Sequence, residues 1–463
     1  MSRPTAGRVT RGELLQRGGA LVAGAAGLGV APAALGSQHS SRAAFDGTLR
    51  ILGIGTDHTS SLEQRAEQEL GFAVAYDVTD PDSLVERAIT QPGSFDVLSY
   101  FHFGYDAIWP TGSLAAVDTR RIARWDEVSP LFKLGKVRPG DAGSTYGQGD
   151  APFRTMYVDG SRRYPVARDK PAGRESMHLV QWIDERTGEA HRGLPEPAFV
   201  AGVPTVFNVD AIGYNTRAID RRPEQVSWAE LLNRRWRGRV ALFGGAHIGF
   251  QDTALAAEAQ GLMRFRDKGD MTRAELDRLT KILIAQKRAG QFHGFWTFGP
   301  EVVDWMRSGD VVVEAMWAAH VVELRRQGFP VRYAAPPEGF RGWSGSLSIS
   351  SAVQDPARLD AAYGYINWQL SGFAGAEMMR FGYYSAVQGP TRRHVDPAEW
   401  AYWIGGRPAA KALPGPFGDV TIRQGEVRDG GSFRRRARRF ASWISIFRQR
   451  VHQERRWQEF LAA

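Results

Sequence analysis

The sequence predicts an α/β protein with parallel sheets and more than one domain. Short apolar segments alternate with amphipathic ones, as in a parallel sheet with helices on both faces. The chain has 463 residues, too many for one ordinary core, and 43% of them are hydrophobic, as in a folded globular protein. Polar and aromatic residues follow several predicted strands directly. These observations set the fold class and the expected place of a site.

The N-terminal half shows the alternation most clearly. Residues 48–55 (TLRILGIG) predict a buried strand, and the helix after it ends at Gly71, because glycine readily takes the left-handed conformation that closes helices. A second strand, a helix and a third strand are predicted at residues 72–78, 83–90 and 95–101.

The C-terminal half repeats the pattern after an interruption. Residues 131–200 are rich in Gly, Pro and charge, so we expect an elaborated surface insertion there. Thr272 and Glu275 have the spacing of a capping box, which predicts a helix that ends at Gly290. The other expected elements are a strand at 203–216, a helix and strand within 227–245, a strand at 308–317, a helix at 319–328, a strand at 330–339 and a helix at 360–372.

The first 36 residues have the layout of an export signal. A basic stretch precedes GGALVAGAAGLGVAPAALG, and Ala34 and Gly36 suit cleavage before Ser37. A membrane anchor is the weaker alternative, because Gly- and Ala-rich segments partition poorly into lipid. The segment TRGELLQRGG is similar to a twin-arginine signal, but Gly12 occupies the place of the second arginine, which leaves the export route open. We expect a cleaved, periplasmic protein.

The net charge of +9 is concentrated at the two ends of the chain. Residues 1–36 carry +3 and residues 433–463 carry +7, which leaves −1 for the residues between them. A nucleic-acid partner is not expected, because the residues between the two basic ends lack the excess of positive charge that a nucleic-acid-binding surface needs. In SFRRRARRFASWISIFRQRV (432–451) apolar residues recur every three or four positions, which predicts one packed closing helix with solvated arginines. Attraction to an anionic membrane surface is the alternative.

Catalytic patterns are missing from the sequence. It contains no cysteine, GxSxG elbow, GxxxxGK[ST] loop or HExxH, and its ten histidines share no metal-ligand spacing. We therefore predict no enzyme, cofactor or metal. The alternative is an exported metal-dependent hydrolase, which would use Asp57 and the histidines that follow predicted strands, namely His58, His102, His247 and His320.

A binding cleft is expected where the strands end. Ligands of open α/β sheets bind outside the carboxyl ends of the strands, where several loops converge. Core packing explains any one aromatic residue there equally well, but polar neighbours accompany nearly all of them. The candidate ligand-binding residues are Thr56, Asp57, His58, Tyr100, Phe101, Phe103, His247, Trp317, His320, Trp343, Ser346, Tyr383 and Tyr384.

Several segments, in order, resemble the extracellular solute-binding proteins of ABC importers, and most closely the spermidine/putrescine-binding branch. They are residues 95–118, 203–216, 227–242, 308–350, 359–372, 428–447 and 455–463. The resemblance implies a two-lobed periplasmic-binding-protein fold (type II-like), with two parallel-sheet lobes joined by crossing strands and one solute between them. It also implies a monomer that serves an inner-membrane ABC permease.

The same resemblance implies the domain boundaries. Lobe 1 would comprise residues 37–208, including the insertion, and would resume at 333–463 with the C-terminal helices. Lobe 2 would comprise residues 209–332.

The chemical class of the solute stays open. A polyamine needs carboxylates for its ammonium groups and aromatic faces for its methylenes. The aromatic residues are present, but only Asp57 and Asp252 are plausible anionic contacts. We expect a polyamine-like solute, with a neutral or carboxylate-bearing solute as the alternative.

Overall fold

The structure is a computed structural model. It describes residues 45–54, 58–129, 131–132, 148–149, 156–158, 199–444 and 448–463. The predicted export segment and most of the predicted insertion lie outside these residues. Within the described ranges, no helix combines the length and the apolar character needed to cross a membrane.

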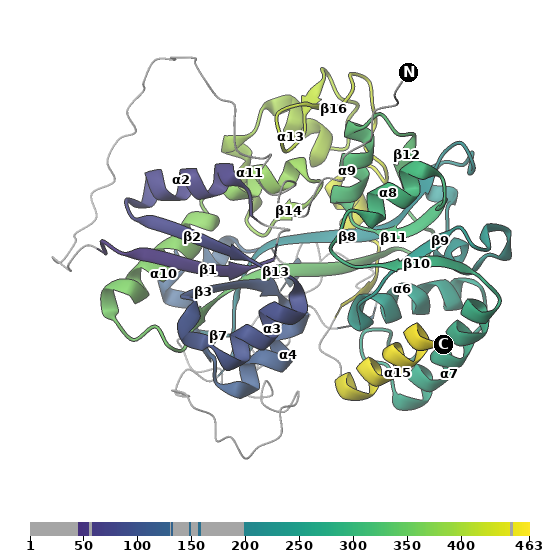
Figure 1. The fold of residues 1–463 in the computed structure, drawn as a ribbon. Coiled ribbons are helices and arrows are strands. Elements are labelled where there is room, and N and C mark those ends of the chain that lie inside the picture. The colour runs from purple at the N-terminus through teal and green to yellow at the C-terminus, as the bar shows by residue number, and fades with distance from the viewer. Residues whose placement is uncertain are drawn as a thin grey trace, which may run out of the picture.

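Two long strands connect the two halves of the molecule. Strands β8 (Val203–Asn215) and β13 (Phe340–Ser350) pair antiparallel, and Figure 1 shows them crossing the middle of the molecule. Beyond β13 lies β3 (Val97–Phe101), and beyond β8 lies β11 (Val313–Met316). All main strands therefore form one continuous sheet in the order β10-β9-β11-β8-β13-β3-β1-β2.

The half of the sheet around β1–β3, here called lobe 1, has the expected parallel strands. Strand β1 pairs in parallel with both β2 and β3. Gly71 ends the first helix with φ 77°, as its position predicts. The elements of this half are β1 (Thr48–Gly53), α2 (Ser60–Leu70), β2 (Ala73–Val78), α3 (Pro81–Thr90), α4 (Tyr105–Ile108), β4 (Leu114–Ala115), β5 (Val117–Asp118), β6 (Tyr157–Val158) and β7 (Phe199–Val200).

The other half, here called lobe 2, is built around β9–β11. Strand β9 pairs in parallel with β10 and β11. The predicted capping box is confirmed, since Thr272 and Glu275 exchange hydrogen bonds at the start of α7. The elements are β9 (Val240–Phe243), α6 (Ala246–Ala259), α7 (Arg273–Arg288), β10 (Phe292–Trp296), α8 (Glu301–Ser308), α9 (Ala318–Arg326) and β12 (Val331–Tyr333). The predicted α/β fold class is confirmed.

The chain after β13 first packs on lobe 1 and then returns across the molecule. Helix α10 contacts β1 and α2, as expected for lobe 1. The elements are α10 (Pro356–Gln369), α11 (Phe373–Arg380), β14 (Tyr384–Ser385), α12 (Gln388–Thr391), α13 (Pro397–Trp403), β15 (Leu413–Pro414), β16 (Val420–Ile422), α14 (Phe433–Ala437), β17 (Phe440–Trp443) and α15 (Arg450–Ala462). Helix α15 packs on α6 and α7 of lobe 2 instead of lobe 1 (Figure 1).

The prediction of one closing helix over 432–451 is wrong. Helix α14 ends at Ala437, and Phe440–Trp443 form strand β17, which pairs with β13. Phe433, Ala437, Phe440, Trp443 and Ile444 are buried, but Val451 is 81% exposed. Arg436 is buried as well, because its guanidinium donates hydrogen bonds to the carbonyls of Val209 and Asp429. Residues 440–443 form a strand instead of the predicted helix because their backbone pairs with the distant strand β13.

Candidate solute-binding site

Aromatic rings from the two lobes meet beside the crossing strands. Phe101 is the last residue of β3 in lobe 1, and Trp317 follows β11 of lobe 2. Their ring centroids lie 6.5 Å apart at an interplanar angle of 60°. Both side chains are buried, so this contact belongs to an interface between the lobes.

Trp317 is surrounded by further rings of lobe 2. It stacks on His320 at 5.3 Å and lies edge-on to Trp296 at 5.0 Å. Phe243 and Phe298 approach it to 5.6 and 5.2 Å. Trp317 is only 5% exposed, whereas Phe298 is 37% exposed and forms the solvent-facing edge of this group.

The rings of lobe 1 form a second group around Phe101. Phe103 stacks on Phe101 at 5.1 Å, and Trp343 of β13 meets the same ring edge-on at 5.4 Å. Tyr383 lies edge-on to Trp343 at 5.3 Å. The two groups together are called the interlobe aromatic cluster below; its members are Phe101, Phe103, Phe243, Phe298, Trp317, His320, Trp343 and Tyr383.

A further contact joins the lobes beside this cluster. Phe103 stacks on His247, the second residue of α6, at 5.6 Å. Nearby, Asp106 of α4 pairs with Arg450 of α15 at 3.5 Å between Oδ2 and Nε. Burial raises the pKa of Asp106 to about 6, and Arg450 opposes this rise.

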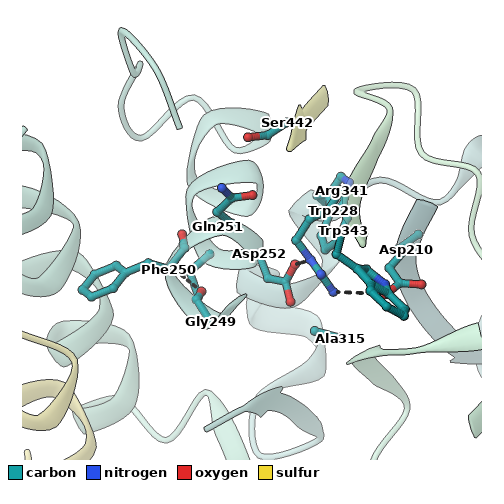
Figure 2. A network of polar contacts seen from close by, with 12 residues as sticks. Asp210, Trp228, Gly249, Phe250, Gln251, Asp252, Ala315, Arg341, Trp343 and Ser442 are labelled. Carbon is teal, nitrogen blue, oxygen red and sulfur yellow. Dashed lines mark hydrogen bonds and ion pairs between the residues drawn. The ribbon is translucent and has the colours of Figure 1, made fainter. Parts of the chain in front are cut away.

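A buried network of acids and one arginine lies under Trp343 (Figure 2). Arg341 Nε donates to Asp252 Oδ1 at 2.6 Å, and its Nη2 lies 3.7 Å from Asp210 Oδ2. Trp343 Nε1 donates to the same Asp210 oxygen at 2.5 Å. Burial raises the pKa of Asp252 to about 6, and the charge of Arg341 opposes this rise.

Three histidines around the cluster are neutral: His102, which is buried, and His247 and His320, which are half-buried. Burial lowers the pKa of His102 to about 4 and the pKa of His247 and His320 to about 3. Among the described residues, no three His, Asp or Glu side chains gather closely enough to hold a metal ion.

The other predicted site residues lie apart from the cluster or outside the description. His58 packs on Tyr76 at 4.3 Å and lines a small pocket under α10 and α11, within lobe 1. Tyr384 contacts Phe207 and Phe433, and Ser346 is a buried residue of β13. Tyr100 packs beside Phe101, with ring centroids 5.5 Å apart and an interplanar angle of 44°. Thr56 and Asp57 lie outside the described residues.

Several residues of the interface were missed by sequence reasoning. Phe243 ends β9 and Phe298 closely follows β10, so the rule of strand ends would have found both. Asp210 and Arg341 lie inside the crossing strands, where side-chain position depends on strand pairing, so no local signal marks them.

Comparison with known proteins finds one family whose model matches part of the chain. Residues 190–402 match the model of the bacterial extracellular solute-binding protein family. No curated protein matches the chain.

Solved structures with this fold are similar over nearly the whole chain. An ABC transporter substrate-binding protein from Bradyrhizobium japonicum has 14% identity and a TM-score of 0.55, over 90% of this chain and 100% of its own. A putative spermidine/putrescine ABC transporter from Listeria monocytogenes has 14% identity and a TM-score of 0.53, over 90% and 99%. The Atu4243-GABA receptor has 15% identity and a TM-score of 0.52, over 89% and 97%. The resemblance seen in the sequence is therefore confirmed: the chain has the two-lobed fold of ABC-transporter substrate-binding proteins, and its residues 190–402 match the extracellular solute-binding family.

Proposed function

We propose that this chain is the exported substrate-binding protein of an ABC importer, which captures a small solute between its lobes and delivers it to an inner-membrane permease. The observation that carries the proposal is the approach of Phe101 and Trp317 across the lobe interface. Proteins of two lobes joined by crossing strands close around ligands by hinge motion, so a solute would insert between surfaces that face each other there.

Trp317 is the proposed anchor of the solute. It lies at the carboxyl end of β11 as the N-cap residue of α9, and its ring faces Phe101 of the other lobe. Aromatic rings bury a large area and lose little conformational freedom on binding, which suits a residue that holds a solute. Phe103, Trp343 and Tyr383 would supply the wall of lobe 1.

Export and assembly follow from the same proposal. Residues 1–36 would direct the chain to the periplasm and be removed before Ser37, so that the mature protein is a soluble monomer. Structural neighbours bear spermidine/putrescine and GABA in their names, which supports a small nitrogenous solute as a class to test. Intact-mass measurement on protein from an exporting host checks the cleavage site.

Ligand-dependent stabilisation tests the binding function. The mature protein is screened by thermal shift against polyamines, amino acids, organic acids and uncharged metabolites. Solute at about a hundred times its dissociation constant should stabilise the fold by roughly 2.7 kcal/mol. Trp317→Ala should abolish this increment, measured against the variant's own unliganded melting temperature.

A matched variant separates binding from packing. Trp457 of α15 is a fully buried tryptophan that packs on Phe250 and lies outside the interlobe aromatic cluster. Trp457→Ala should lower stability but keep the ligand-induced shift. If Trp317→Ala keeps the shift as well, the interlobe site is refuted.

A further inference from the structure

We infer that the solute held between the lobes is uncharged. The inference rests on the proposed function and narrows it, because the sequence left polyamine, neutral and carboxylate-bearing solutes open. Its basis is that, among the described residues, the ionisable side chains that contact the rings of the interlobe aromatic cluster or are buried beside them are paired with one another or held uncharged by burial.

The two acids nearest the cluster have their own partners. Asp210 Oδ1 accepts hydrogen bonds from Asn208 Nδ2 at 2.8 Å and from the Tyr333 hydroxyl at 3.0 Å. Its Oδ2 accepts from Trp343 Nε1, and Asp252 binds Arg341. Asp210 and Asp252 are at most 1% exposed. An ammonium group would have to displace these partners to reach either carboxylate, so the aspartates do not serve a polyamine.

Arg341, the arginine of the buried network under Trp343, is also already paired. Arg341 is 1% exposed and has a carboxylate on either side, at 2.6 and 3.7 Å. Its Nη1 has no hydrogen-bond partner among the described residues. Taken by itself, this free donor would suit a carboxylate of the solute. Two negative groups already share this one positive charge, however, so a third carboxylate would be repelled. Arg450, near His247, is likewise paired with Asp106.

Three further titratable groups beside the cluster, His247, His320 and Glu314, are held in their uncharged forms by burial. Burial keeps the pKa of His247 and His320 near 3, so both imidazoles are neutral. Glu314 of β11 lies three residues before Trp317, is fully buried, and neither of its carboxyl oxygens has a hydrogen-bond partner among the described residues. Burial raises the pKa of this carboxyl well above its usual value, which favours its uncharged form.

The cluster therefore offers aromatic faces and neutral imidazoles to a solute. Moving an unpaired charge from water into such a site costs far more than moving a neutral polar group that finds a hydrogen bond. A neutral imidazole can donate one hydrogen bond and accept another. A flat or apolar body with one or two neutral polar groups fits this chemistry.

Fractionation of a metabolite mixture tests the charge of the solute without knowing its identity. A bacterial metabolite extract is passed over a cation exchanger at pH 2, which retains amines and zwitterions, and then over an anion exchanger at pH 7, which retains acids. This yields cationic, anionic and unretained fractions, and only the last holds uncharged molecules. Each fraction is added to the mature full-length protein, and the melting temperature is measured. The unretained fraction should give the stabilising shift.

The outcomes separate this inference from the proposed function. A shift confined to the cationic or the anionic fraction overturns the inference but supports solute binding. No shift with any fraction overturns both. Spermidine, putrescine and 1,4-butanediol, the uncharged analogue of putrescine, serve as defined probes, and stabilisation by either polyamine also overturns the inference.

A pair of variants links the result to the cluster. His320→Glu places a carboxylate against the Trp317 ring and should abolish the shift given by the unretained fraction. His293→Glu makes the same change at an exposed residue that contacts Trp305 and should leave the shift unchanged. Equal shifts in both variants would show that the neutral solute binds elsewhere.

Discussion

Trp343 Nε1 donates a 2.5 Å hydrogen bond to Asp210 Oδ2, and this bond ties the two crossing strands together through their side chains. The residues come from β13 and β8, which are also paired by their backbones. Because Trp343 is a member of the interlobe aromatic cluster, the same bond fixes the position of one ring of the cluster relative to the two crossing strands. The stability of the fold and the proposed solute-binding site therefore share a residue here.

Removal of that hydrogen bond should weaken the fold. Trp343→Phe keeps a ring but leaves buried Asp210 without one of its donors, so we expect the free energy of unfolding to fall by about 1–3 kcal/mol. Denaturant unfolding measures the change. Trp305→Phe, at a half-buried ring of α8, is the control and should cost less. Equal losses of unfolding free energy in the two variants would mean that the hydrogen bond to Asp210 does not contribute to stability.

The C-terminal helix should stabilise lobe 2. Trp457 and Phe460 of α15 are fully buried and contact Phe250, Phe292 and Phe295 of lobe 2. Phe460→Ala should lower stability by about 3–5 kcal/mol, as truncations of buried aromatic residues do. Val451→Ala, on an 81% exposed side chain of the same helix, should change stability by no more than about 0.5 kcal/mol. Similar melting temperatures for the two variants would contradict the packing.

The stability contributed by Asp106 should depend on pH. Burial raises the pKa of Asp106 to about 6, so the folded protein holds this proton more tightly than the unfolded chain does. The associated stability is present below the unfolded pKa of about 4 and is lost as the pH rises to about 6. Relative to Asp106→Asn, the unmodified protein should therefore lose up to about 3 kcal/mol across this window and stay level above it.

Denaturant unfolding of both proteins at intervals between pH 4 and 7.5 measures this difference. Asp304→Asn, at an exposed aspartate of α8, controls for the change of charge. Curves for Asp106→Asn and the unmodified protein that run parallel over the whole range would show that Asp106 titrates as an exposed residue.

The buried carboxyl of Glu314 should cost stability. Its oxygens have no hydrogen-bond partner among the described residues, and a buried polar group without a partner costs about 1–3 kcal/mol. Glu314→Met keeps a similar volume and removes the polar atoms, so we expect a gain of that order at pH 7. A clear loss of stability would mean that the carboxyl makes a contact with residues outside the described ranges.

The fold class and most elements could be predicted because their signals are local. The helix ending at Gly71 and the capping box of Thr272 and Glu275 depend on residues within one turn of each other, and both are confirmed. Strand β8 matches the prediction for the same reason, since its apolar run is continuous in the sequence. The predicted ends of strands also named most rings of the interlobe aromatic cluster, whose role in binding stays a prediction.

The sequence by itself thus determined many of the strands and helices, because periodicity and capping act between neighbours along the chain, but it did not mark Phe340–Ser350 as a strand. Only the tertiary structure decided that residues 440–443 form a strand, because the competing hydrogen bonds come from β13, about a hundred residues earlier. It also decided that Phe101 faces Trp317, that His58 lies within lobe 1, and that Arg341 lies between two aspartates. Each of these relationships depends on which strands lie side by side. Pairing between strands that are distant along the chain produces no periodic pattern in the sequence, so the sequence alone does not predict it.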